Sequence, residues 1–125
     1  MWFYRFEQNN LGGEYLEDEV LTRNVIIEAL SEIEANEKAK KLGISFDGCY
    51  VKNEGWRMRW GPAWSDDAQS KKEIFRDLDN ELNWEFHRPR TKVFARIFYA
   101  DGRKQIILDP KHEGNQGLPP FEGID

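Results

Sequence analysis

The chain has 125 residues, of which 39% are hydrophobic, 14% aromatic and 33% charged, and its 23 acidic and 18 basic residues give a net charge of −5. This length fits one domain, the lack of any run of about 18 apolar residues excludes a membrane-spanning helix, and the aromatic content excludes disorder over most of the chain. A single cysteine, Cys49, excludes an intramolecular disulfide and a zinc site built from thiolates alone. Because the N-terminus also lacks the regions of a signal peptide, we expect a cytoplasmic protein.

Two strands are predicted near the N-terminus. Residues 2–8 alternate in character, which predicts a strand with Trp2, Tyr4 and Phe6 on one face. Residues 9–13 are rich in Asn and Gly and predict a turn. The contiguous β-branched residues at 25–27 predict a second strand over 20–28, buried on both of its faces.

A helix is predicted directly after these strands. Ser31 is a suitable N-cap, and Glu34 three residues later predicts a capping box. A narrow apolar stripe follows, and Gly43 marks the helix end. A short strand is expected over 44–46.

The second half of the chain begins with a segment of alternating residues over 56–60. Trp56, Met58 and Trp60 fall on one face and Arg57 and Arg59 on the other, which predicts a half-buried strand.

A second helix, a hairpin and a tail complete the predicted organisation. The pair Ser70 and Glu73 predicts another capping box and a helix over 70–83. Residues 92–108 predict a hairpin that turns at Asp101-Gly102. We therefore expect an α+β domain over residues 1–108, with a mostly antiparallel sheet of about four to six strands and two helices packed on it. Residues 109–125 are rich in Pro and Gly and predict an extended C-terminal tail.

The search for catalytic chemistry favours a protein that is not an enzyme. Cys49, His87 and His112 stand isolated in the sequence, and we expect a buried thiol, a partly exposed histidine and a tail histidine. No nucleophile motif and no phosphate-binding loop is present, so no metal and no cofactor is expected. A cleft holding Asp66, Asp67 or His87 with shifted pKa values is the alternative that would indicate an enzyme or a small-ligand binder.

An aromatic and basic segment is the first candidate binding face. Trp, Tyr and Arg dominate protein-interface hot spots, which favours a partner-binding role for these residues: Trp56, Arg57, Arg59, Trp60, Trp64, Arg88 and Arg90. The alternative is a single-stranded nucleic-acid binder that uses the Trp/Arg segment 56–64 for base stacking. The net charge of −5 argues against that alternative.

Acidic residues gather in the N-terminal part of the chain. The first fifty residues hold ten acids and five bases, and Glu17, Asp18 and Glu19 are consecutive. A carboxylate surface of this kind steers association with a basic, nucleic-acid-binding protein. We therefore include these three residues in the candidate partner face, with mimicry of nucleic acid as the stronger form of the hypothesis.

Segments in the first fifty residues resemble small uncharacterised proteins encoded by tailed bacteriophages. The resemblance rests on Met1–Gly13, Ile26–Ala29, Glu34–Asn36 and Leu42–Gly48, in that order. Many of those proteins continue into a Cys-rich stretch, whereas this chain has Cys49 alone, so a metal site is not carried over. The resemblance implies a phage origin rather than a mechanism.

A phage origin favours, by analogy, a host-takeover or anti-defence factor. The leading hypothesis is a non-enzymatic phage accessory protein that binds and inhibits a host protein. The expected target is a bacterial anti-phage defence factor such as a CRISPR effector, met in the cytoplasm of the infected host.

Overall fold

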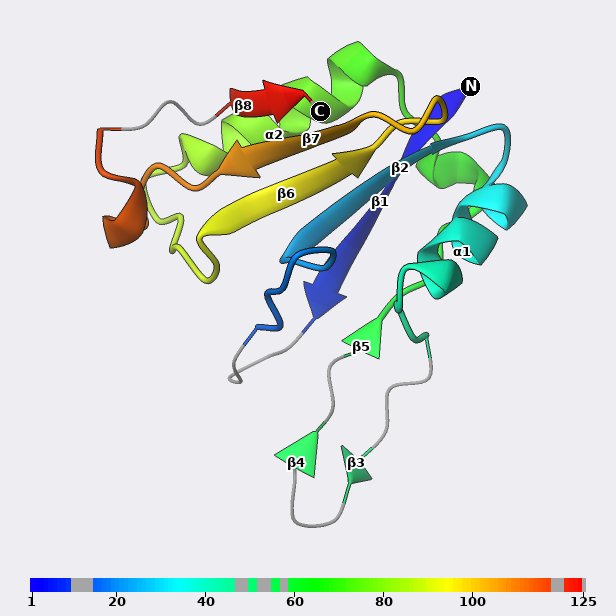
Figure 1. The fold of residues 1–125 in the computed structure, drawn as a ribbon, viewed down its shortest axis with the longest axis horizontal. Helices are drawn as coiled ribbons and strands as arrows, with labels where there is room; N and C mark the ends of the chain where they lie inside the picture. The colour runs from blue at the N-terminus through cyan, green and yellow to red at the C-terminus, as the bar shows by residue number, and fades with distance from the viewer. Residues whose placement is uncertain (10–14, 47–49, 52–54, 57–58, 118–120, 125) are drawn as a thin grey trace.

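The computed structural model describes residues 1–9, 15–46, 50–51, 55–56, 59–117 and 121–124, with only the backbone described at 9, 50–51, 55–56, 59 and 121–124. Figure 1 shows the elements in chain order. The helices are α1 (Glu32–Lys41) and α2 (Lys71–Leu82), and the short 3₁₀ turns are η1 (Ser65–Asp67) and η2 (Glu113–Asn115). The strands are β1 (Trp2–Asn9), β2 (Asn24–Ala29), β3 (Tyr50–Val51), β4 (Gly55–Trp56), β5 (Arg59–Trp60), β6 (Val93–Phe98), β7 (Lys104–Leu108) and β8 (Phe121–Ile124).

Six of the strands form one sheet in the order β5-β1-β2-β6-β7-β8, and β3 and β4 form a second, two-stranded sheet. The pair β2 and β6 is parallel, and the remaining pairs are antiparallel. A parallel pair needs a long crossover connection, and here both helices lie in the chain between β2 and β6. The predicted α+β class with a mostly antiparallel sheet is confirmed.

The two helices pack on opposite faces of the sheet. Tyr4 and Phe6 of β1 belong to the core cluster that contains Ala35 of α1. Phe3 of the same strand belongs to the second cluster, which contains Ile74 and Leu78 of α2. Because successive strand residues point to opposite faces, each helix covers the side chains that the other does not.

The predicted capping box forms with both of its bonds at α2 and with one of them at α1. Ser31 accepts a hydrogen bond from the Glu34 N–H at 3.3 Å. At α2, Ser70 and Glu73 form both bonds of the predicted capping box, at 3.1 and 3.2 Å.

The strand predicted at 44–46 is wrong. Gly43 has φ +104° and ends the helix, and the Ile44 N–H then donates to the Ala39 carbonyl at 3.0 Å. This turn places the Ile44 side chain in the α1 core cluster, so its backbone serves the helix end.

The C-terminal hairpin is confirmed, but the domain does not end at residue 108. Gly102 has φ +92° in the turn between β6 and β7, as its Asp-Gly sequence predicts. Beyond it, Asp109 and Asn115 are buried, and the backbone of β8 adds a strand beside β7. The described part of the expected tail therefore belongs to the folded domain, because Asp109, Lys111 and Asn115 bond to residues of the body.

No helix in the described part of the chain is long and apolar enough to cross a membrane.

The core assignment gives a stability prediction for a matched pair of leucines. Leu78 of α2 is fully buried, whereas Leu30 is 66% exposed. We expect Leu78→Ala to lower the free energy of unfolding by about 2–5 kcal/mol and Leu30→Ala to change it by less than about 0.5 kcal/mol. Urea denaturation followed by circular dichroism measures both, and equal effects would contradict the assignment.

Candidate binding surfaces

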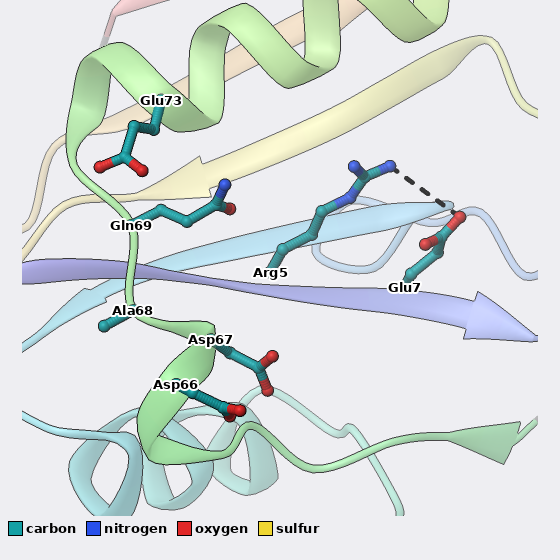
Figure 2. Close-up of a pocket in the computed structure, with 7 residues that line it drawn as sticks. All are labelled: Arg5, Glu7, Asp66, Asp67, Ala68, Gln69 and Glu73. Atoms are coloured by element: carbon teal, nitrogen blue, oxygen red, sulfur yellow. Dashed lines mark ion pairs between the residues drawn. The ribbon is translucent and has the colours of Figure 1, made fainter.

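A polar hollow of about 470 Å³ lies between β1, η1 and the start of α2. Figure 2 shows the Arg5 side chain of β1 extended towards Glu7, with which it forms an ion pair at 3.9 Å, and Asp66 and Asp67 on η1. Gln69 and Glu73 line its remaining side. The hollow contains Asp66 and Asp67, as the alternative of an enzyme or small-ligand binder requires. The hydrogen-bond partners of its charged groups indicate whether those groups are available for such a role.

Most charged groups of the hollow hold structural elements together. Arg5 donates to Glu81 at 2.6 Å and to Asn24 at 2.9 Å, which ties β1 to α2 and β2. Asp67 accepts from the Trp64 N–H at 2.7 Å and closes η1. Hydrogen bonds from the backbone and the hydroxyl of Ser70 hold the pKa of Glu73 below its usual value. A low pKa keeps this carboxyl ionised at neutral pH, which suits a helix cap and does not suit a general acid.

Four large apolar residues are exposed at one end of the sheet, and we call them the apolar end surface: Trp2, Leu30, Ile33 and Trp64. Each is between 48% and 67% exposed. Three of them lie together because Trp2 stands opposite Ala29 in the β1–β2 register, Leu30 follows Ala29, and Ile33 lies in the first turn of α1.

Two contacts bring Trp64 to the same end. The Asn36 side chain bonds to both the N–H and the carbonyl of Ala63, at 2.8 and 3.0 Å. Phe3 and Gln69 exchange backbone hydrogen bonds at 2.8 and 3.0 Å. The segment that carries Trp64 is therefore fastened both to α1 and to the start of β1. Exposed apolar groups gathered in this way mark interaction sites.

Exposed aromatic and basic residues form a second surface at the opposite end, which we call the 84–90 surface: Trp84, Phe86, Arg88 and Arg90. In Figure 1 the loop after α2 lies at the far side of the sheet from the N-terminus and the start of α1. The rings of Trp84 and Phe86 meet edge to face with centroids 5.4 Å apart, and they are 58% and 64% exposed. Both arginines are also exposed.

A buried histidine and a lysine fix the backbone of this surface. His87 Nε2 lies 2.6 Å from Asp109 Oδ2, and both side chains are 1% exposed. Lys111 Nζ donates to the carbonyls of Trp84, Glu85 and His87 at 2.9 to 3.3 Å. The expectation that His87 is partly exposed is therefore wrong: Asp109, from the expected tail, supplies a buried hydrogen-bond partner.

The predicted segment 56–64 is divided by the structure. Trp60 is 3% exposed and belongs to the α1 core cluster, so its predicted role in partner binding or base stacking is corrected. Trp64 is exposed as that role requires. The backbone of Trp56 pairs with Tyr50 and that of Arg59 with Asn9. Arg57, like Cys49, lies outside the described residues.

Two of the three acidic candidates have internal partners. Glu17 accepts from the backbone N–H groups of Lys92 and Val93 at 2.9 and 2.7 Å. Asp18 closes a turn, accepting from the N–H groups of Leu21 and Val20 at 2.6 and 2.7 Å. Glu19 is exposed.

Sequence reasoning missed five surface residues, of which three carry a signal in the sequence. Ile33 lies off the stripe of buried alanines in α1, which indicates exposure. Leu30 and Trp2 have no such pattern. Trp84 and Phe86 occupy the same alternate positions as the exposed Arg88 and Arg90, which indicates exposure. His87 occupies a position between them, on the opposite face of an extended segment.

The comparison with known proteins identifies the family. Residues 1–116 match the family model described as "Domain of unknown function (DUF7296)", and the chain belongs to this family. No curated protein and no solved structure matches.

The turn at Asp18 gives a prediction on pH. Hydrogen bonds from the backbone of Leu21 and Val20 hold the pKa of Asp18 below its usual value, so this carboxylate stabilises the fold above the unfolded pKa of about 3.9. We expect carbon-detected NMR to give a pKa of folded Asp18 below that unfolded value. The stabilisation should be lost as the pH falls through the pKa of the folded protein. Asp18→Ala should remove this pH dependence, and a normal Asp18 pKa would contradict the turn.

The buried pair gives a second prediction. We expect Asp109→Ala to lower the free energy of unfolding by about 3 kcal/mol, because it leaves His87 buried without its partner. Asp101→Ala is the matched control, since the exposed Asp101 carboxylate accepts from the neighbouring Arg103, and its loss should change the free energy of unfolding far less than the loss of Asp109. Denaturant titration measures both variants, and a small effect at Asp109 would show that the pair contributes little.

Proposed function

We propose that the protein is a non-enzymatic binding domain that docks on a partner protein through the apolar end surface. The observation that supports this proposal is the exposure of Trp2, Leu30, Ile33 and Trp64 at one end of the sheet. Aromatic anchors surrounded by apolar residues that exclude water supply most of the energy of protein interfaces. The two contacts of Asn36 with Ala63 hold the Trp64 segment before any partner arrives, which reduces the ordering cost of binding.

The charge around this surface indicates the chemistry of the partner. Asp66 and Asp67 lie in η1, directly after the segment that carries Trp64, and both are exposed. Glu32 is the first residue of α1 and precedes Ile33. An apolar centre with an acidic rim is complementary to an apolar patch rimmed by Lys and Arg. Proteins that bind nucleic acid carry such basic surfaces.

The expected basic surface on the partner makes the hypothesis of a phage protein that inhibits a host protein more specific. We propose that the protein acts in the cytoplasm of an infected bacterium and inhibits a host anti-phage defence factor that binds nucleic acid, such as a CRISPR effector. Inhibition would follow from occupation of the basic surface that the target uses for its nucleic acid. The acidic rim of the apolar end surface would then replace phosphate groups.

Affinity capture with paired double variants tests the proposal. The tagged protein is incubated with bacterial lysate, with and without nuclease, and bound proteins are identified by mass spectrometry. We expect one stoichiometric partner that resists nuclease, is reduced at least about tenfold by Trp64→Ala with Ile33→Ala, and is retained by Trp84→Ala with Phe86→Ala.

The purified partner then provides the functional measurement. Adding the wild-type protein should lower the partner's affinity for its nucleic acid, and the Trp64/Ile33 variant should not. A partner that is lost on nuclease treatment, or whose capture is unaffected by the Trp64/Ile33 variant, would overturn the proposal.

A further inference from the structure

The 84–90 surface differs in chemistry from the apolar end surface. Its exposed rings, Trp84 and Phe86, have charged rather than apolar sequence neighbours, namely Glu85 between them and Arg88 and Arg90 after them. A protein hot spot is surrounded by contacts that exclude water, whereas single-stranded nucleic acid binds to aromatic rings placed in a solvated, cationic setting. The charged residues around Trp84 and Phe86 match the setting in which single-stranded nucleic acid binds.

The local charge has the sign that a polyanion needs. Residues 84–92 contain three bases, Arg88, Arg90 and Lys92, against one acid, Glu85. Neither arginine side chain makes an ion pair within the described residues. Two acids from other segments contact this loop: Glu17 accepts from the N–H groups of Lys92 and Val93, and Asp109 bonds to His87. Two bases from other segments also contact it, Lys111 and Arg23, so the excess of positive charge within residues 84–92 remains.

The backbone beneath the rings is held in place by buried contacts. The His87 ring bonds to Asp109 and packs edge to face on Phe94 with centroids 5.4 Å apart. Arg23 Nη1 donates to the Arg88 carbonyl at 2.9 Å and fixes the next turn of the loop. Because these contacts exist in the free protein, a ligand would find the rings and the arginines already positioned.

We infer that the 84–90 surface binds single-stranded nucleic acid. Unpaired bases stack on the open faces of Trp84 and Phe86, and Arg88 and Arg90 contact the phosphates of the same strand. Stacking of this kind tolerates any base sequence, because every base has a π-face. This site is independent of the proposed protein partner, whose contacts lie at the other end of the sheet.

Fluorescence anisotropy with a labelled oligothymidylate of about 15 nucleotides tests the inference. We expect saturable binding at about 50 mM salt that weakens steeply towards about 200 mM. Trp84→Ala with Phe86→Ala should weaken binding by about tenfold to a hundredfold. Arg88→Ala with Arg90→Ala should weaken it and reduce the salt dependence. Trp64→Ala is the matched control and should leave binding unchanged.

Several results would overturn the inference. These are the absence of saturable binding at low salt, unchanged binding by the Trp84/Phe86 variant, and equal affinity for an oligonucleotide duplex, whose bases are not free to stack. All the substituted residues are exposed, and circular dichroism of each variant verifies its fold. A protein captured through Trp84 and Phe86 instead of an oligonucleotide would also count against it. Loss of oligonucleotide binding would leave the Trp64-dependent capture untouched, so the two proposals fail separately.

Discussion

Burial of β2 on both of its faces is the constraint on which the rest of the structure depends. Val25 and Ile27 belong to the core cluster of α1, and Ile26 between them belongs to the cluster of α2. A strand with this pattern is stable only where apolar layers cover both sides of the sheet. The chain meets that demand by placing one helix on each face within the long connection that leads to the parallel partner, β6.

This arrangement leaves the two ends of the sheet to the connecting segments. The helices cover the faces, so the residues that remain exposed gather where strands and helices begin or end, as loops usually do. At one end Asn36 and Gln69 fasten the segment that carries Trp64. At the other end Asp109 and Lys111 fasten the loop that carries Trp84. The segments that carry Trp64 and Trp84 are thus held in place by hydrogen bonds within the protein, and the two surfaces differ in their surrounding charge.

Features that depend on neighbouring residues can be predicted from the sequence. Features that depend on contacts between residues far apart in the chain cannot. The Ser70–Glu73 capping box and the Asp101-Gly102 turn follow from adjacent residues, and both are confirmed. The alternation over 84–90 places His87 on the side opposite the exposed residues, but its buried partner Asp109 is twenty-two residues away, so no local pattern reveals that partner. The alternation over 56–60 places Trp60 on the apolar face of a half-buried strand, and its burial in the α1 core cluster agrees with that pattern. Alternation alone does not distinguish a core tryptophan from an interface tryptophan. For the same reason, the two surfaces are visible only once the fold brings their residues together.

We propose that opposite ends of this small domain bind different classes of ligand. The indole N–H signals of the five tryptophans in an NMR spectrum report on it directly, because Trp2 and Trp64 lie at one end and Trp84 at the other. We expect the captured protein partner to shift the signals of Trp2 and Trp64 and to leave that of Trp84 in place, and we expect an oligothymidylate to do the reverse. Perturbation of Trp84 by the protein partner, with Trp2 and Trp64 unmoved, would contradict it.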